Sequence, residues 1–462
     1  MSSQQSSGPH PGDPRPGDPH SGDPRPLPRQ ILALAVPALG ALVAEPLFLL
    51  ADTAIIGWLG VEELAGAALG VTVMQTVVGI MIFLAYSTTP AVARFVGAGR
   101  PTKALAAGRD GLWLAIMLGG VLALAGVALA EPLLVAMGSD DDVHHHALSY
   151  LLWSLPGLPA MLLVFAAVGM LRGFQDTKTP LVVAAAGFGA NALLNLILVH
   201  PVGLSVAGAA IGTSLAQWGM AIAYLWMLIP RIRAAGVALG PEPAALRRAA
   251  GVGSWMMLRT VTLRAAIVAT VVVATDLGPE TLAAHQVAFT FFSTLAFVLD
   301  ALAIAAQALI GRELGAGREA AARRMVRVMT LWAVGFGVVV GALTAAAAPW
   351  VPRLFTPSAT VAEAITVALF VLAVSQPLAG YVFVLDGVLM GAGDVRYLAL
   401  VGVVNLGIYL PVLWWVHDTV SGGQQTQIIL WLWVAFAVVF MGARALTLGI
   451  RAVGTRWMVL GE

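Results

Sequence analysis

Residues 110–133 read DGLWLAIMLGGVLALAGVALAEPL, a run of 24 residues in which only Asp110 and Glu131 carry a charge. A bilayer core about 30 Å thick is crossed by roughly 20 apolar residues in an α-helix. A lone segment crosses as a helix because the helix satisfies its own backbone hydrogen bonds, which lipid cannot do. This stretch is therefore typical of a transmembrane helix.

Eleven further apolar stretches of similar length occur on both sides of this one. They lie near residues 31–57, 70–96, 147–171, 181–200, 205–230, 250–275, 281–310, 327–350, 361–390, 396–416 and 427–449. The sequence therefore predicts an all-α polytopic membrane protein with twelve transmembrane helices.

The composition of the whole chain agrees with this interpretation. Of its 462 residues, 59% are hydrophobic and only 11% are charged, whereas soluble domains are about 45–50% apolar and about 25% charged. The net charge of +1 gives no argument for a nucleic-acid partner. The absence of cysteine excludes disulfides, thiolate nucleophiles and cysteine metal sites.

The distribution of basic residues predicts the orientation, because Lys and Arg are retained on the cytoplasmic side. Every second loop is basic, with Arg15, Arg25 and Arg29 in the tail, then Arg100, Lys103 and Arg109, Arg172 and Lys178, Arg231, Arg233, Arg247 and Arg248, Arg312, Arg318, Arg323, Arg324 and Arg327, Arg396, and Arg451 and Arg456. The other loops contain only Arg353 and are acidic. We expect a multi-pass protein of the cell (inner or plasma) membrane with both termini in the cytoplasm.

The chain contains an internal duplication with an offset of 218 residues. The sequence GAGR at residues 97–100 recurs at residues 315–318, and Pro159, Gly173 and Asp176 correspond to Pro377, Gly391 and Asp394. Six spans bring each half back to its starting side, so the two halves are parallel repeats. Secondary transporters use such repeats to place a site between two lobes, although an ancient duplication without a transport role is the alternative.

These observations predict four regions. Residues 1–29 are rich in Gly, Asp and Pro and form a disordered tail. Residues 30–230 form an amino-terminal lobe, residues 231–248 a basic cytoplasmic linker, and residues 249–462 a carboxyl-terminal lobe with a short tail.

Several motifs resemble those of the multidrug and toxic compound extrusion (MATE) family, in particular its DinF-like branch. They are ADT at residues 51–53, RGFQDTKTP at 172–180, AGAAIGT at 207–213, AAHQ at 283–286 and LDG at 385–387. The resemblance covers nearly the whole chain after the tail. It implies export of organic, often cationic, compounds, driven by the entry of protons or sodium ions.

Asp52 is the most informative charged residue inside a predicted span. A charge at mid-bilayer costs at least about 2.5–3.5 kcal/mol, so its retention suggests a function. Its counterpart 218 residues later is Thr270, so the charge does not belong to the shared scaffold. The resemblance implies that Asp52 couples transport to a cation, H⁺ or Na⁺, while a structural hydrogen bond to a neighbouring helix is the alternative.

Three polar residues are expected around Asp52. Asn191 and Asn195 lie one turn apart and share a helix face, and with Thr213 they match the polar positions around this aspartate in relatives. Asn195 stands where relatives often have a second aspartate. A single carboxylate with amide neighbours suits proton carriage better than tight sodium binding.

The first span carries candidates for a hinge and a cavity wall. Pro37 and Pro46 can bend it, because each removes a backbone donor and obstructs the preceding turn. Glu45 lies two turns before Asp52 and is a candidate for the cavity wall or for an ion pair. Prolines that are merely tolerated are an equal alternative.

The carboxyl-terminal half carries Arg259 and Arg264 in its first predicted span, Asp300 in its second and Asp386 in its fourth. Arg259, Asp300 and Asp386 are expected at similar depth, where a neutralising cluster would lower the cost of each charge. Asp386 matches a cation-binding aspartate of another branch of the family, but the accompanying glutamate of that branch is absent. We therefore expect a structural or gating network rather than a second cation site.

The substrate surface is harder to predict. Aromatic and methionine side chains could contact an organic cation, and the candidates are Trp255, Met256, Met257, Phe291 and Phe292, which could equally pack against helices or lipid. The run His144–His146 beside Asp140–Asp142 is interpreted as a solvated loop rather than a metal site. His285, at the end of a span, is as readily a packing residue as a proton relay.

The sequence favours a cation-coupled multidrug antiporter over the alternatives. It contains no phosphate-binding loop and no metalloprotease or hydrolase signature, so we expect neither ATP hydrolysis nor an enzyme. A lipid-linked sugar flippase would favour a more basic cavity, and a passive channel would leave Asp52 without a coupling task. We expect drug-like small-molecule substrates and the lipid bilayer as partners, no nucleic acid, no cofactor and a monomer.

Overall fold

The computed structural model of this chain describes residues 26–137 and 141–461. The side chains of Glu45, Asp141 and Asp142 lie outside this description. Most of the predicted tail, residues 1–29, also lies outside it, but its last residues do not. The first helix begins at Leu27, three residues before the predicted lobe, and Pro28 occupies its first turn, where proline is tolerated.

The described residues form helices and no strand, and twelve segments are long and apolar enough to cross a membrane. This confirms the predicted class and the number of spans. The α-helices are α1 (Leu27–Gly57), α2 (Val61–Met81), α3 (Phe83–Gly97), α4 (Pro101–Ala136), α5 (Asp141–Ser154), α6 (Leu158–Gly173), α7 (Lys178–Val199), α8 (Ser205–Ala234), α9 (Pro243–Asp276), α10 (Pro279–Gly315), α11 (Glu319–Ala347), α12 (Ala359–Gly391), α13 (Val395–Val420), α14 (Gln425–Val434) and α15 (Met441–Val453).

Three spans consist of more than one of these helices. The second span comprises α2 and α3, and the fourth joins α5 to α6 through the short 3₁₀ segment η1 (Leu155–Gly157). The twelfth joins α14 to α15 through a π-helical segment, η3 (Ala435–Phe440). A further 3₁₀ segment, η2 (Val351–Leu354), follows α11.

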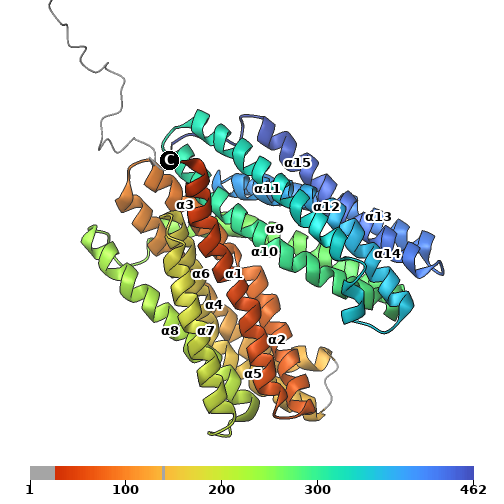
Figure 1. The fold of residues 1–462 in the computed structure, drawn as a ribbon. Helices are drawn as coiled ribbons and strands as arrows, with labels where there is room; N and C mark the ends of the chain where they lie inside the picture. The colour runs from red at the N-terminus through yellow and green to blue at the C-terminus, as the bar shows by residue number, and fades with distance from the viewer. Residues whose placement is uncertain (1–25, 138–140, 462) are drawn as a thin grey trace, which may run out of the picture.

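Figure 1 shows two bundles, the amino-terminal lobe of α1–α8 and the carboxyl-terminal lobe of α9–α15. They meet at the end of the molecule where α1 begins and α15 ends, here called the closed end, and diverge toward the opposite, far end (Figure 1). The contacts between lobes come mainly from α1 and α3 against α10, with α3 and α4 against α9.

The two lobes repeat the same close helix contacts at the offset found in the sequence. A Cβ placed on Gly119 would lie 2.5 Å from Cα of Pro159, and one on Gly337 would lie 2.7 Å from Cα of Pro377. Further along the same repeat, Gly387 approaches the backbone oxygen of Ala303 in the way that Gly169 approaches that of Ala85. The two lobes are therefore pseudo-symmetric in packing as well as in sequence.

The repeat-related helices α3 and α10 cross each other at the closed end. A Cβ on Gly97 would lie 1.9 Å from the backbone oxygen of Arg312, and one on Gly315 would lie 2.0 Å from that of Arg94. The two contacts are equivalent under the 218-residue offset. Only glycine permits backbones to approach this closely, so the GAGR repeats hold the two lobes together.

The chain after α15 runs back to this crossing. The guanidinium of Arg94 donates hydrogen bonds to the backbone oxygens of Ala392, Val459 and Gly461, at 2.7–2.9 Å. The amide of Gly461 donates to the oxygen of Leu314, and the side chain of Trp457 is buried in the main core. Residues 454–461, here called the C-terminal strap, thus contact both lobes.

Candidate functional site

A cavity of about 180 Å³ lies within the amino-terminal lobe, and Asp52 is among the residues that line it. Residues of α1–α3 and α5–α8 line it, so it lies inside one lobe rather than between the two. On α6 the lining extends from Gly157 to Arg172, a length of about 22 Å at 1.5 Å per residue. The cavity is therefore long and narrow.

Asp52 lines this cavity and is hydrogen-bonded to a chain of polar groups. The amide of Asn195 donates to the carboxylate of Asp52 and to Oδ1 of Asn191, the latter at 2.9 Å. The amide of Asn191 donates to Oγ1 of Thr213 at 3.0 Å. The structure thus brings together the four residues proposed from the sequence as a cation-coupling site.

This geometry follows from helix spacing and from one glycine. Asn191 and Asn195 are four residues apart on α7 and face α8. A Cβ on Gly212 of α8 would lie only 2.0 Å from Oδ1 of Asn195, so the glycine makes room for that amide. Asp52 is 5% exposed and Asn195 is fully buried. Oδ1 of Asn195 itself has no hydrogen-bond partner among the described residues.

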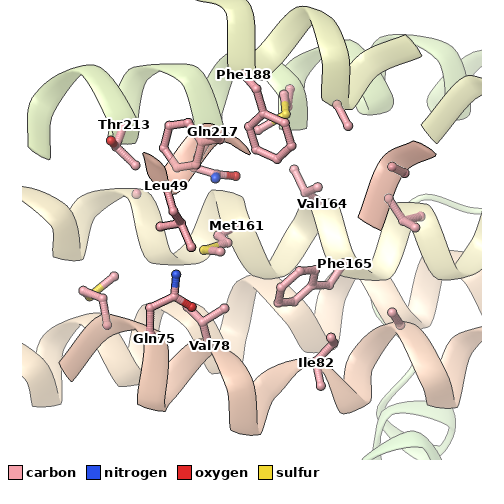
Figure 2. Close-up of a pocket in the computed structure, with 18 of the residues that line it drawn as sticks. Leu49, Gln75, Val78, Ile82, Met161, Val164, Phe165, Phe188, Thr213 and Gln217 are labelled. Carbon is pink, nitrogen blue, oxygen red and sulfur yellow. The ribbon is translucent and has the colours of Figure 1, made fainter. Parts of the chain in front are cut away.

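The rest of the cavity wall is largely apolar, with aromatic and sulfur-containing side chains. Figure 2 shows Met161 and Phe165 on α6 and Phe188 on α7. It also shows Val78 near the end of α2 and Ile82 directly after that helix. Two amides, Gln75 of α2 and Gln217 of α8, project toward the middle from opposite sides (Figure 2). Such a wall suits an amphipathic organic molecule.

None of the five residues proposed from the sequence as a substrate surface lines this cavity, so that expectation stays a prediction. Met256 is fully buried in the main core and Met257 is exposed on α9. Trp255 packs under Arg396, and Phe292 packs against Phe436. Phe291 lines a separate apolar space among α10–α12. Aromatic composition did not reveal which helix faces enclose a cavity.

The two prolines of α1 lie within one continuous helix from Leu27 to Gly57. Neither Pro37 nor Pro46 lines the cavity, although Leu42 and Leu49 of the same helix do. The side chain of Glu45 is outside the described residues, so its predicted place in the wall stays untested.

Arg172 was counted from the sequence as a loop cation, but it lies in α6 and is only 8% exposed. It lines the cavity near the closed end, together with Tyr86 and Tyr224. The signal that could have revealed this place is its position one residue before the end of the fourth span. A charge at that depth can face inward as readily as toward solvent.

The charged residues of the carboxyl-terminal lobe form a smaller network than expected. Nε of Arg259 donates to Oδ1 of Asp386 at 3.2 Å, and its terminal nitrogen pairs with Oδ2. Nη2 of Arg444 lies 3.3 Å from the same Oδ2. Arg444, on α15, was missed although it lies inside the predicted span at residues 427–449, where its charge was the signal.

Asp300 does not join this pair directly. Its Oδ2 accepts a hydrogen bond of 2.8 Å from the hydroxyl of Tyr86, which belongs to the other lobe. The side chain of Gln307 donates to the backbone oxygen of Tyr86 as well. Asp300 lies within electrostatic range of Arg172 and Arg259, so it connects the charges of both lobes.

The histidines show no metal site. Within residues 26–137 and 141–461, no three His, Asp or Glu side chains gather to hold a metal ion. His285 is 1% exposed, and its two ring nitrogens lack a hydrogen-bond partner in the part of the chain described. It packs against Phe289 and Trp433, with ring centroids 5.7 Å apart in each case, as a buried neutral side chain does.

Comparison with known families matches both halves of the chain. A family model described as MatE matches residues 37–197 and again residues 254–415. The two matched segments lie in the two lobes and begin 217 residues apart, close to the repeat offset.

Similar curated proteins are found in plants and bacteria. Protein DETOXIFICATION 44 of Arabidopsis thaliana is 31% identical over 80% of this chain and 73% of its own length. Multidrug resistance protein NorM of Burkholderia vietnamiensis is 28% identical over 83% of this chain and 85% of its own. DNA damage-inducible protein F of Escherichia coli is 28% identical over 61% of this chain and 63% of its own.

Solved structures share the fold. The bent form of the Vibrio cholerae MATE transporter VcmN superposes with a TM-score of 0.83 at 21% identity, covering 93% of this chain and 98% of that one. A MOP superfamily transporter from Pyrococcus furiosus gives 0.83 at 20% identity, covering 95% and 98%.

Proposed function

This chain belongs to the MatE family of multidrug and toxin efflux transporters, and from that premise we propose that it is a secondary active antiporter. It is a multi-pass membrane transporter rather than an enzyme, and its substrates are small molecules. In the proposed cycle, an inward-moving cation is exchanged for an organic, often cationic and amphipathic, compound.

One observation carries the proposal. Asp52, the carboxylate nearest the far end of α1, lines a cavity with an apolar wall and is held by Asn195. A buried carboxylate that binds and releases a cation changes the charge inside this cavity, and a charge in low dielectric costs far more than in water. Cation binding at Asp52 and occupation of the cavity by an organic cation therefore compete, which is what antiport requires.

Protons are the favoured coupling ion. The proposed site offers one carboxylate, two amides and one hydroxyl, namely Asp52, Asn191, Asn195 and Thr213. The site holds a single carboxylate, and Asn195 directs its amide hydrogens, rather than its oxygen, at Asp52 and Asn191. The carboxylate alone is sufficient to carry a proton.

The lobes are proposed to rock about the closed end, which we place in the cytoplasm. Many of the basic loop residues belong to the connections at that end, as positive-inside retention requires. The lobes diverge away from it (Figure 1), so this state would face the outside. The cavity, at 180 Å³, is smaller than the 300–1,000 Å³ typical of drug sites, so α1 must move before a drug fits.

The test is gradient-driven transport by the purified full-length protein in proteoliposomes. A fluorescent organic cation is loaded, and a pH gradient or a sodium gradient is imposed separately, with wild type beside Asp52→Asn. In wild type, we expect the pH gradient to raise the transport rate at least about tenfold above the rate measured without a gradient. Asp52→Asn should bind the dye and fail to respond to either gradient.

Glu62→Gln is the matched control, because Glu62 is an exposed carboxylate at the far end of the same lobe. It should leave gradient-driven transport unchanged. Full gradient response in Asp52→Asn would refute the coupling assignment. Response to sodium alone would replace the proton by sodium, and movement of a lipid-linked sugar without any gradient would favour a flippase.

A further inference from the structure

The cavity of the amino-terminal lobe carries opposite charges at its two ends. Asp52 lies five residues before the far end of α1, and Arg172 lies one residue before the closed end of α6. Both side chains line the same cavity. The wall between them is apolar apart from a few amides and hydroxyls, so the two charges are not cancelled by neighbouring side chains along its length.

Arg172 has no hydrogen-bond or ion-pair partner for its guanidinium among the described residues. Its side chain is more than nine-tenths buried, at 8% exposed. Burying a charged group without a partner is costly, and guanidinium groups in proteins are normally satisfied by carboxylates, phosphates or water. Arg172 lines the cavity, so its guanidinium is placed to donate to a ligand there.

The nearest acid does not neutralise it. Asp300 lies in electrostatic range of Arg172, but its carboxylate accepts the hydroxyl of Tyr86 instead. Asp386 is already paired with both Arg259 and Arg444. Asp176 lies in electrostatic range of Tyr224, but its carboxylate accepts hydrogen bonds from the amide and the hydroxyl of Thr179. None of these three aspartates is hydrogen-bonded to the guanidinium of Arg172 in the described part of the chain.

Tyr224 completes the arrangement. Its side chain is 1% exposed and lines the cavity on α8, within electrostatic range of Arg172. No hydrogen bond to its hydroxyl occurs in the described part of the chain. A neutral phenol beside a guanidinium adds one more donor for an oxyanion.

We propose that Arg172 and Tyr224 form an anion subsite at the closed end of the cavity, which binds the carboxylate of an amphipathic substrate. The transporter then takes aromatic acids and zwitterions in preference to purely cationic compounds of the same shape. This inference rests on the proposed efflux function and specifies the substrate class of the same cavity. A guanidinium can donate two parallel hydrogen bonds to the two oxygens of a carboxylate. An ester cannot accept this bidentate pair.

The test compares two probes that differ only in this group. They are a fluorescent aminoxanthene dye with a free benzoate and the methyl ester of the same dye, bound to the full-length protein in nanodiscs of neutral lipid. We expect wild type to bind the acid at least about tenfold more tightly than the ester. Arg172→Gln should remove this preference by weakening the acid alone, and Arg172→Lys should keep part of it.

Arg231→Gln is the matched control, since Arg231 is exposed at the end of α8 and outside the cavity. It should leave the preference intact. Soluble benzoate is added as a competitor, and in a separate series anionic lipid is mixed into the nanodiscs that hold the protein. Displacement of the acid dye by anionic lipid but not by soluble benzoate would assign the subsite to a lipid headgroup and overturn the substrate class.

Two results would overturn the proposal outright. One is equal affinity of wild type for acid and ester, which needs no variant and so does not depend on folding. The other is an equal loss of both dyes in Arg172→Gln, which would mean that Arg172 serves only the contact with Asp300. Gradient-driven transport of the ester is also measured in Arg172→Gln. If it persists, the antiport function is intact and only the anion subsite has failed.

Discussion

Asn195 determines how Asp52 is held, and Gly212 determines where Asn195 lies. Because a Cβ on Gly212 would fall 2.0 Å from Oδ1 of Asn195, Gly212→Ala must push the amide away from its bonds to Asp52 and Asn191. Overpacking of this kind costs about 1–3 kcal/mol. We expect gradient-driven transport to fall about tenfold, while dye binding changes little.

Gly219→Ala on the same helix is the control, because no heavy atom lies within 4 Å of the Cβ it would add. Transport in proteoliposomes and the thermal unfolding midpoint should be measured for both variants. Unchanged gradient response in Gly212→Ala, at wild-type expression, would show that the hydrogen bond from Asn195 to Asp52 is dispensable.

Single residues also show which parts of the candidate site could be predicted from the sequence. Asn191 and Asn195 were placed on one helix face by their i, i+4 spacing. Their grouping with Asp52 and Thr213 came from the family resemblance, and the hydrogen bonds link the same four residues. Arg172 was assigned to a loop, whereas it lines the cavity. A side chain near the end of a span can reach either solvent or an internal cavity within one helical turn. Partners such as Tyr86 for Asp300 depend on the packing of lobes, which no local pattern encodes.

At the scale of helices, the crossing of α3 and α10 fixes how the lobes meet. Gly315→Ala would place a methyl group 2.0 Å from the backbone oxygen of Arg94, and backbone cannot rotate away as a side chain can. The helices must separate, so we expect the free energy of unfolding to fall by about 1–3 kcal/mol. The thermal unfolding midpoint of the purified protein measures this loss.

Gly335→Ala on α11 provides the comparison. No heavy atom lies within 4 Å of its added Cβ, and alanine is the better helix former by about 1 kcal/mol. Its midpoint should therefore stay constant or rise. Equal midpoints for Gly315→Ala and wild type would contradict a tight crossing in the stable state.

The helices themselves were largely predictable, because span length and hydropathy are set by the bilayer rather than by tertiary contacts. The twelve spans were found, and the 218-residue duplication recurs in the packing, as in the contact of Gly119 with Pro159 and that of Gly337 with Pro377. The boundaries were less accurate. The predicted linker at residues 231–248 is mostly helix, as α8 continues to Ala234 and α9 begins at Pro243, since polar residues extend helices beyond the membrane.

At the scale of the whole molecule, the C-terminal strap is the element that connects lobes without belonging to a span. Ending the chain after Val453 would remove two of the three acceptors of Arg94, the bond from Gly461 to Leu314 and the burial of Trp457. Burying one large side chain alone contributes about 1.5–3 kcal/mol. The closed end should therefore open more often in the shortened protein.

Cysteine labelling measures that opening directly, because the chain has no cysteine of its own. Ala93 is fully buried against Gly311 at the lobe interface, so Ala93→Cys should react with a maleimide only when the lobes part. We expect labelling at least about tenfold faster in the shortened protein and in Trp457→Ala than in the full chain. Thr102→Cys, exposed on α4, should label equally in all three. Equal rates at Ala93→Cys would mean that the crossing of α3 and α10 closes this end unaided, and that the strap only covers it.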